Sequence, residues 1–392
     1  MNDIIPYAKH ALTEADKKAV IDAMESSAWT QGPRVSEFES AISNYVKTKH
    51  SVAVTNGTAA LHLGVLALER FYRKNKTQDK KKKVISTPIT FAASTNCALY
   101  ANLEPQLIDI HEDSACLDIE KTIDYIKKNH NSITGVVPVS FGGYPLDLKE
   151  LYEICQKHGI WIMEDACHAL GAWRKSPDQV FASSCRYSDA SILSFHPAKH
   201  IACGEGGMLL TQHQEVAETA SLLRTHGIQK NIPGKALFAQ EMIELGYNYR
   251  ISDILCALGI GQLKRIEENI NRRNEIALKY RKELVDTPLR PIQDSNETNV
   301  RNAYHLFVAR CPMRDDLYNY LREHKIYCQF HYTPIYKHPY YQKHFPNLES
   351  EFTNSEKYYL EALSFPMYPS LKDEEQDFVI SKIKAFYASN SH

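Results

Sequence analysis

The sequence predicts an α/β protein with a mostly parallel central sheet, flanking helices and a smaller C-terminal α+β domain. Three observations carry this prediction. Strand-like and helical segments alternate up to about residue 210, a long helical stretch begins at Ile251, and 392 residues exceed what one hydrophobic core usually serves. We therefore expect a large domain with an N-terminal arm over residues 1–250, and a long connecting helix with a small domain over residues 251–392.

The first half of the chain alternates between the two kinds of segment. Strand-like runs are 51–55 ("SVAVT"), 84–87, 135–139 ("GVVPV"), 160–163 ("IWIM"), 191–195 and 208–211. Helical stretches are 59–68, 91–99 and 148–158. Strands that alternate with helices form a parallel sheet covered by helices, and ligands bind beyond the carboxyl ends of its strands.

The second half begins with one long helical pattern, from residue 251 to about residue 286, in which Gly259 and Gly261 are candidate bend positions. The chain beyond it mixes short strand-like and helical stretches and is rich in tyrosine. We interpret this part as the smaller α+β domain.

The composition indicates a globular protein and excludes several classes. Hydrophobic residues make up 43% of the chain, charged residues 24%, and the net charge of −1 gives no overall field for nucleic acid or an anionic membrane. The basic run 73–83 lacks interleaved aromatic residues, and we expect a solvated loop there. No apolar run approaches the roughly 20 residues that span a bilayer, and the first residues lack the features of a signal peptide.

Cysteine and histidine usage argues against disulfides and metal. The nine cysteines are scattered without a C-x-x-C pair, which predicts reduced thiols and a cytoplasmic protein. His196 and His200 have i, i+4 spacing, but Pro197 follows the first and no metal-activated base lies between them. We therefore expect no metal site.

A helix start and an aromatic residue follow the first two predicted strands. Segment 55–61 ("TNGTAAL") passes through Gly57 into a helix, and the free N–H groups and dipole of a helix start favour an anion such as phosphate. Phe91 opens the next predicted helix. Each feature alone also fits an ordinary βα turn or core packing.

A carboxylate and a lysine follow two later strands. Asp165 comes directly after an apolar strand, with His168 three residues on, and it could cap a helix or pair with a buried cationic nitrogen. Lys199 lies in a turn after strand 191–195, just before the glycine cluster 204–207 ("GEGG"). A lysine there is a surface residue or, if desolvated, a nucleophile toward carbonyls.

All four features are expected at one edge of the sheet, and together they match pyridoxal 5′-phosphate. Its phosphate needs N–H and hydroxyl donors, and its ring needs an aromatic face. Its pyridine nitrogen stays protonated only beside an anion, and its aldehyde forms a Schiff base with lysine.

The sequence also resembles the DegT/StrS-type sugar aminotransferases, pyridoxal-phosphate enzymes of the aspartate-aminotransferase fold (fold type I). The resemblance covers nearly the whole chain, through the motifs "WTQGPRVSEFE", "TNGTAAL", "TPITFAAS", "EDACHALGA", "SFHPAKHIACGEGGMLLT", "RTHGI" and "GYNYRISDILCALGIGQL". A narrower likeness, in "SFHPAKH…GEGG" and in 329–341 ("QFHYTPIYKHPYY"), is to the branch that aminates C4 of a UDP-linked 4-keto-6-deoxy-N-acetylhexosamine in pseudaminic acid biosynthesis.

The resemblance implies roles for the residues at the strand ends. Lys199 would form the Schiff base and later move a proton. Asp165 would pair with the pyridinium nitrogen, His168 would hydrogen-bond near the ring hydroxyl, and Phe91 would stack on the ring. The residues implied as phosphate contacts are Gly57, Thr58 and Ser194.

The resemblance also implies a homodimer with shared active sites, because Asn248 of "YNYR" would reach the phosphate of the other subunit. The partners implied are L-glutamate and a nucleotide sugar, with no nucleic acid and no membrane. The residues implied for sugar binding are Tyr7, Gln31, His331 and Tyr332.

The chain departs from the family pattern at Cys167, Cys256 and Leu255, none of which removes a catalytic group. Three alternatives remain: a C4 aminotransferase for a dTDP- or GDP-linked keto sugar, a sugar dehydratase on the same fold, and a non-catalytic sensor. Relatives that carry histidine in place of the Schiff-base lysine perform dehydration, so the retained Lys199 favours transamination. A sensor would be expected to lose Asp165 or Lys199, and both are present.

Overall fold

The computed structural model describes residues 4–73, 82–175, 177–230, 232–236, 238–293, 298–346 and 352–390. Most of the basic run predicted as a loop at 73–83 lies outside these residues. None of the described helices is long and apolar enough to cross a membrane.

The core of the fold is a seven-stranded sheet in the order β1-β9-β8-β5-β4-β2-β3. Neighbouring strands from β8 to β3 are parallel, whereas β9 runs antiparallel to both β1 and β8. The mostly parallel α/β sheet predicted from the sequence is therefore confirmed. Its strands are β1 (His50–Val54), β2 (Lys83–Ser86), β3 (Glu104–Leu107), β4 (Ile133–Val136), β5 (Trp161–Asp165), β8 (Ala190–Ser194) and β9 (Gly207–Thr211).

Two layers of helices cover the sheet, because successive strand residues point to opposite faces. In β8, Ile192 packs in a cluster with α3, α4 and α7, whereas Leu193 packs in a cluster with α2 and α8. In β5, Ile162 likewise packs in a cluster with α5 and α6. The helices of the two layers are α2 (Pro33–Val46), α3 (Gly57–Arg73), α4 (Ala93–Tyr100), α5 (Ile119–Asn129), α6 (Lys149–His158), α7 (Gln214–Leu223) and α8 (Asp253–Leu263).

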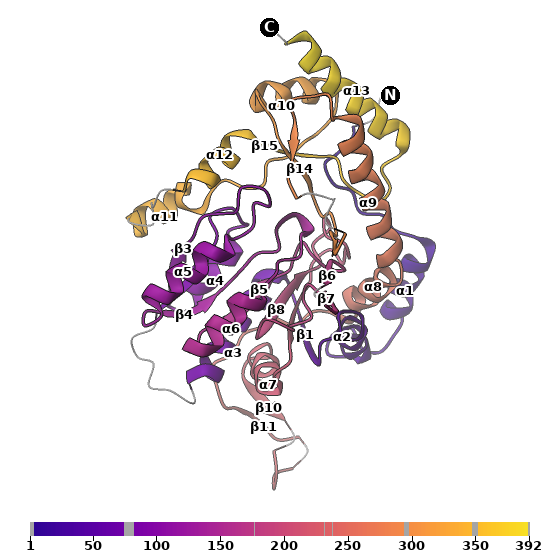
Figure 1. Ribbon diagram of the computed structural model, residues 1–392. Helices are drawn as coiled ribbons and strands as arrows, with labels where there is room; N and C mark the ends of the chain where they lie inside the picture. The colour runs from indigo at the N-terminus through magenta and orange to yellow at the C-terminus, as the bar shows by residue number, and fades with distance from the viewer. Residues whose placement is uncertain are drawn as a thin grey trace.

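A second core is formed by the C-terminal elements, which gather at one end of the molecule with α9 leading to them (Figure 1). A three-stranded sheet in the order β12-β14-β15 is its centre. The elements of this core are α9 (Ile266–Glu283), β14 (Phe307–Arg310), α10 (Arg314–Glu323), β15 (Ala362–Phe365) and α13 (Asp373–Ser389), with β12 (Arg290–Pro291) at the sheet edge. The C-terminal helices α11 (Pro339–His344) and α12 (Thr353–Glu361) pack in two other clusters. The domain boundary expected at residue 250 stays a prediction.

Smaller elements complete the described chain. They are helix α1 (Glu14–Met24), a three-stranded sheet of β6 (Trp173–Lys175), β7 (Gln179–Phe181) and β13 (Val300–Arg301), and a two-stranded sheet of β10 (Ile228–Lys230) and β11 (Gln240–Met242). Two short 3-10 helices span Phe141–Gly143 and Ile335–Lys337. Side-chain caps begin the helices α1 and α8: the Thr13 hydroxyl accepts a hydrogen bond from a backbone N–H at the start of α1, and the Ser252 hydroxyl does the same for α8.

The long helix predicted from residue 251 is two helices, α8 and α9, and the break lies at Lys264 and Arg265 rather than at the glycines. The glycines serve close packing instead. A Cβ on Gly259 would lie 2.6 Å from the Phe38 ring, and one on Gly261 would lie 2.8 Å from a carboxylate oxygen of Asp16.

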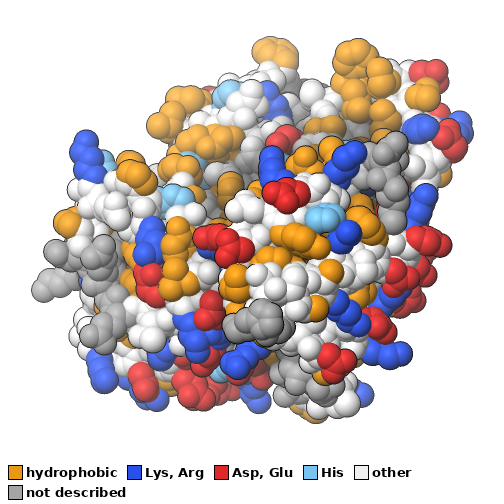
Figure 2. All heavy atoms as spheres, turned by 90° about the horizontal axis from the view of Figure 1, so that it is seen from above, with side chains coloured by type: hydrophobic (Ala, Val, Ile, Leu, Met, Phe, Trp, Pro, Cys, Tyr) orange, Lys and Arg blue, Asp and Glu red, His pale blue; other side chains and the backbone are white. Residues whose placement is uncertain are grey.

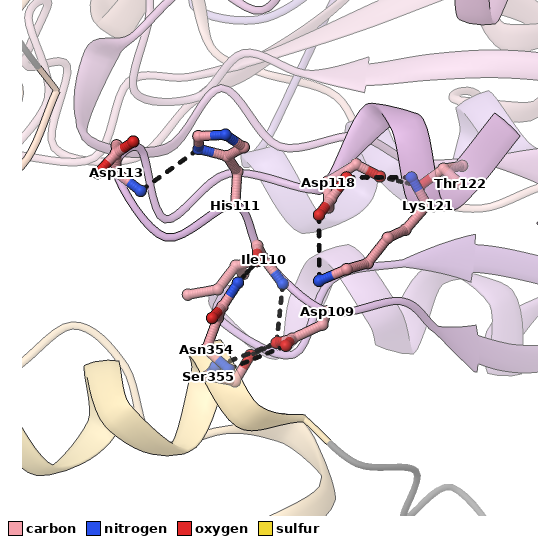
Figure 3. A network of polar contacts seen from close by, with 9 residues as sticks. All are labelled: Asp109, Ile110, His111, Asp113, Asp118, Lys121, Thr122, Asn354 and Ser355. Atoms are coloured by element: carbon pink, nitrogen blue, oxygen red, sulfur yellow. Dashed lines mark hydrogen bonds and ion pairs between the residues drawn. The ribbon is translucent and has the colours of Figure 1, made fainter. Parts of the chain in front are cut away.

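Asp109, just after β3, fastens α12 to the large sheet (Figure 3). Its carboxylate accepts hydrogen bonds from the Asn354 N–H at 2.9 Å, the Ser355 N–H at 3.0 Å and the Ser355 hydroxyl at 2.6 Å. The Asn354 side chain also donates to the Ile110 carbonyl at 2.9 Å. The two cores are thereby joined at the edge of the sheet where the candidate site lies.

On the face shown in Figure 2, acidic and basic side chains are interspersed, in keeping with the net charge of −1.

Candidate active site

A cavity of about 530 Å³, which we call the central cavity, lies at the carboxyl ends of β1, β2, β5 and β8. All residues predicted for the site except Gln31 and Asn248 line it. The expected convergence of features at one edge of the sheet is therefore observed, and the position agrees with where parallel α/β sheets bind ligands.

The start of α3 lines the central cavity and has the features of an anion-binding site. The Asn56 side chain accepts a hydrogen bond from the Ala59 N–H at 2.8 Å, and within the described part of the chain the N–H groups of Gly57 and Thr58 have no hydrogen-bond partner. Ser194, at the end of β8, lies close by: a Cβ on Gly57 would be 3.1 Å from the Ser194 Cβ. Two free N–H groups and a hydroxyl at a helix start are suited to bind phosphate.

Asp165 is buried at the end of β5, and its carboxylate is held by two donors. The Ser94 hydroxyl donates to Oδ2 at 2.6 Å, and the Cys167 N–H donates to Oδ1 at 3.1 Å. Thr90 in turn hydrogen-bonds Ser94 at 2.7 Å. The network fixes the orientation of the carboxylate inside the cavity, where it can pair with a cationic ring nitrogen.

Lys199 lies in the turn after β8, where its backbone N–H donates to the His196 carbonyl at 2.8 Å. Its side chain is partly buried in the central cavity, and burial lowers the pKa of the amine, while Cys167 and Asp165 nearby oppose that shift. Its Nζ lies 3.5 Å from Nε2 of His305. A lysine amine with a lowered pKa is the nucleophile that bonds carbonyl groups.

His168 is buried beside Asp165 and is uncharged. Burial, with Lys199 next in importance, holds its pKa well below the usual value. Its Nδ1 accepts a hydrogen bond from the Gly142 N–H at 3.3 Å, so the ring proton is on Nε2, which lies 3.3 Å from the Tyr332 hydroxyl. The histidine therefore presents an N–H donor toward Tyr332 and the cavity.

Phe91 precedes α4, which begins at Ala93 rather than at Phe91 itself. The ring remains 61% exposed although it lines the central cavity, and it meets the Tyr332 ring edge-on at 5.9 Å. An exposed aromatic ring at a cavity wall offers a face on which a flat ligand can stack. Core packing, the ordinary alternative for Phe91, is excluded by this exposure.

The side of the cavity expected to bind sugar comes from the C-terminal part of the chain and the N-terminal arm. His331 is buried, with Nδ1 2.8 Å from the Ser364 hydroxyl, and its ring lies 5.4 Å from that of Tyr7. Tyr358 of α12 donates a hydrogen bond to the His331 carbonyl at 2.7 Å. Because Asp109 anchors α12, this chain of contacts fixes the sugar-side segment relative to the sheet.

Gln31 and Asn248 lie outside the central cavity. Gln31 lines a separate hollow of about 340 Å³ that also includes Thr225 and Arg250. The backbone of Asn248 pairs with that of Thr225. Asn248 was expected to reach the cavity of another subunit, and its place outside the cavity of its own chain agrees with that expectation without testing it. Gln31 was expected at the sugar site and lies outside the cavity of its own chain, near Asn248.

Sequence reasoning missed several residues of the cavity wall. Asn56 directly precedes Gly57, and Ser94 lies three residues after Phe91. Their polar side chains in the motifs "TNGT" and "FAAS" could have indicated both residues. His305 and Glu205 also line the cavity. His305 gave no usable signal, because it precedes a strand of the other core and reaches the cavity only through the tertiary fold.

The donor set fits pyridoxal 5′-phosphate. The start of α3 has unpaired N–H groups for a phosphate, and Phe91 leaves a ring face open. Asp165 and Lys199 have the charge and the amine that the pyridine nitrogen and the aldehyde require. The cavity is also large enough to admit a further ligand beside the cofactor.

Comparisons with known proteins agree with this arrangement. The model of the DegT/DnrJ/EryC1/StrS aminotransferase family matches residues 10–384. A Campylobacter jejuni protein named UDP-4-amino-4,6-dideoxy-N-acetyl-beta-L-altrosamine transaminase is 33% identical over 381 residues, covering 96% of each chain. The spore coat polysaccharide biosynthesis protein SpsC of Bacillus subtilis is 32% identical, covering 98% of this chain and 97% of SpsC.

Among solved structures, Helicobacter pylori PseC, described as an aminotransferase involved in the biosynthesis of pseudoaminic acid, superposes with a TM-score of 0.87. It is 27% identical in sequence, and the superposition covers 99% of this chain and 100% of PseC.

Proposed function

Because the chain belongs to the DegT/DnrJ/EryC1/StrS aminotransferase family, we propose that it moves an amino group from L-glutamate to C4 of a UDP-linked 4-keto-6-deoxy-N-acetylhexosamine. The chain is a sugar aminotransferase, and aminotransferases of this family depend on pyridoxal 5′-phosphate. The product would be an amino sugar for the biosynthesis of pseudaminic acid.

The residues of the central cavity can each be given a task toward the cofactor. When bound, pyridoxal 5′-phosphate supplies a carbonyl that bonds amines and a protonated ring that withdraws electrons. Lys199 would hold the carbonyl carbon through Nζ, and Asp165, oriented by Ser94, would hold the protonated ring nitrogen. His168 would donate from Nε2 near the ring hydroxyl, and Phe91 would cover one ring face.

Phosphate binding and proton transfer complete the assignment. The N–H groups of Gly57 and Thr58 and the hydroxyl of Ser194 would bind the phosphate at the start of α3. Lys199 Nζ, once its amine is free, is the base that accepts the proton released by the α-carbon of the amino donor. Because donor and sugar use the same cavity in turn, we expect ping-pong kinetics.

The single observation that carries the sugar assignment is the C-terminal and N-terminal-arm part of the cavity wall. Tyr7, His331 and Tyr332 line the same cavity as Lys199, and the C. jejuni relative, named as an altrosamine transaminase, matches nearly the whole chain. We propose that Tyr332 stacks on the hexose and that His331 orients it.

We further propose that two chains share each site. Gln31 and Asn248 lie together outside the central cavity of their own chain, as residues that act in the cavity of a second subunit would. In this arrangement Asn248 contacts the cofactor phosphate and Gln31 the sugar of the other subunit.

The test is mass spectrometry of products formed from L-glutamate and a panel of UDP-, GDP- and dTDP-linked 4-keto-6-deoxy sugars, with Lys199→Ala as the inactive control. The proposal predicts an aminated product from UDP-2-acetamido-2,6-dideoxy-L-arabino-hex-4-ulose in preference to its D-xylo epimer. A preference for the D-xylo epimer or for another nucleotide would overturn the substrate assignment. A product that has lost a hydroxyl without gaining nitrogen would instead indicate a dehydratase.

A further inference from the structure

His305 is a buried histidine that contacts Lys199 and has no assigned role. Its Nε2 lies 3.5 Å from the Lys199 Nζ, and 4% of the residue is exposed. Its ring lies 4.3 Å from the ring of His168 and 5.8 Å from that of His200. It reaches the cavity from the segment just before β14.

The backbone around His305 is held firmly in place. The buried guanidinium of Arg273 donates to the carbonyl oxygens of Tyr304 at 3.0 Å and His305 at 3.4 Å. On the other side, the Leu306 N–H donates to the Gly142 carbonyl at 3.1 Å. Since the chain is fixed on both sides of the imidazole, the position of Nε2 relative to Lys199 is set by the fold.

The hydrogen bonding of the imidazole indicates which nitrogen carries the proton. Nδ1 of His305 is buried and has no hydrogen-bond partner among the described residues. Orphaned buried N–H groups are rarer than orphaned acceptors, so the bare nitrogen is Nδ1 and the proton is on Nε2. An Nε2–H that points to Lys199 requires a neutral amine as acceptor.

The surroundings of the pair disfavour the charged form of each partner. Burial holds the pKa of His305 well below its usual value, and Lys199, His168, His200 and Arg273 act in the same direction. Burial also lowers the pKa of Lys199, against the opposing effects of Cys167 and Asp165.

We propose that His305 is a positioning residue that holds the Lys199 amine, through a hydrogen bond from Nε2–H to Nζ, whenever that amine is not bonded to the cofactor. The amine is thereby kept unprotonated and aimed into the central cavity, ready to bond the cofactor again or to accept a proton. This inference rests on the proposed role of Lys199, but it concerns a state of the protein that can be studied without cofactor.

The test uses the full-length apoprotein and measures how fast an amine-selective acylating reagent labels Lys199 as pH rises, with site-resolved mass spectrometry. His305→Phe keeps a ring without a donor, whereas His305→Gln retains an N–H donor near the position of Nε2. His62→Phe is the matched control, because His62 is also buried with an unpartnered ring nitrogen but does not line the central cavity.

We expect His305→Phe to raise the pH at which labelling of Lys199 is half-maximal, because the neutral amine loses a hydrogen bond. Below that pH the labelling rate should fall about tenfold, the effect of one hydrogen bond of ordinary net strength. His305→Gln and His62→Phe should stay close to wild type. An unchanged or lowered midpoint in His305→Phe would overturn the proposal, and so would a His305→Gln midpoint displaced as far as that of His305→Phe. Borohydride reduction and peptide mapping of the holoenzyme test the role of Lys199 separately, so the two failures can be told apart.

Discussion

Gly207→Ala is the substitution that tests most sharply how the sheet supports the phosphate end of the cavity. Gly207 begins β9, and the sequence showed it only as the last member of the glycine cluster 204–207. In the structure it lies against the backbone that leads into α3. A Cβ there would be 2.4 Å from the carbonyl carbon and oxygen of Asn56 and 2.6 Å from the nitrogen of Gly57.

The size of the effect follows from these distances. Non-bonded carbon atoms prefer a separation of about 3.5 Å, so either β9 or the start of α3 must move by about 1 Å. Both neighbours are backbone atoms, which cannot rotate away as a side chain can. Overpacking of this kind costs about 1–3 kcal/mol. If the strain is relieved by displacing the N–H groups that bind phosphate, the binding free energy of the cofactor weakens by that amount and its Kd rises about tenfold to a hundredfold.

The assay is titration of apoprotein with pyridoxal 5′-phosphate, followed by absorbance, together with denaturant unfolding of the same apoprotein. Gly206→Ala is the matched control, because the atoms nearest to a Cβ at Gly206 would be side-chain atoms of Phe195 and Ile251, at 3.1 to 3.2 Å. We expect Gly206→Ala to change stability slightly and to leave the Kd near that of wild type. Cofactor binding by Gly207→Ala that equals wild type would refute the reasoning.

Four further predictions follow from the geometry. Mixing inactive Lys199→Ala with inactive Asn248→Ala subunits should restore about one quarter of wild-type activity if pairing is random and sites are shared; no recovery after confirmed subunit exchange would exclude sharing. Tyr332→Ala should change the ratio of kcat/KM for the L-arabino and D-xylo epimers, and an unchanged ratio would remove it from the sugar site. Alkylation should modify Cys167 before the other cysteines, because Cys167 is partly exposed in the cavity and the others are buried. The reaction should need alkaline pH, because burial raises the pKa of the Cys167 thiol and the thiolate is the reacting form. Bound cofactor should protect Cys167, and equal rates with and without cofactor would argue against this position. Burial lowers the pKa of His200 to about 3, whereas the unfolded-state pKa is about 6.5. The neutral histidine therefore stabilises the fold above about pH 6.5, and this contribution is lost as pH falls toward 3. The denaturation midpoint of His200→Phe should depend less on pH between 7 and 4 than that of wild type, and an equal dependence would contradict this.

The alternation of strands and helices, and the position of the cavity at the carboxyl ends of the strands, could be predicted because they depend on local sequence patterns, whereas the order of the strands in the sheet was not predicted. Apolar runs followed by polar residues such as Asp165 mark the carboxyl ends of strands, and parallel strands bring those ends to one edge. The antiparallel direction of β9 was not predicted from the sequence. Only twelve residues separate it from β8, and in the structure residues 195–206 form turns rather than a crossover helix.

Residues that meet only through the tertiary fold could not be predicted. Ser94 reaches Asp165 across 71 positions of sequence, and His305 reaches Lys199 across 106. The break between α8 and α9 was also missed, because no glycine or proline marks Lys264 and Arg265. The family resemblance supplied roles for conspicuous motif residues but not for these supporting contacts.

We expect that Lys199, in the turn after β8 in the central cavity, is the residue that holds the cofactor. Borohydride reduction of the purified holoenzyme, followed by proteolysis and mass spectrometry of the peptides, tests it directly. The reduced cofactor should be found on the peptide that contains Lys199, and Lys199→Ala should bind the cofactor without a covalent label. Reduced cofactor on any other lysine would contradict the account.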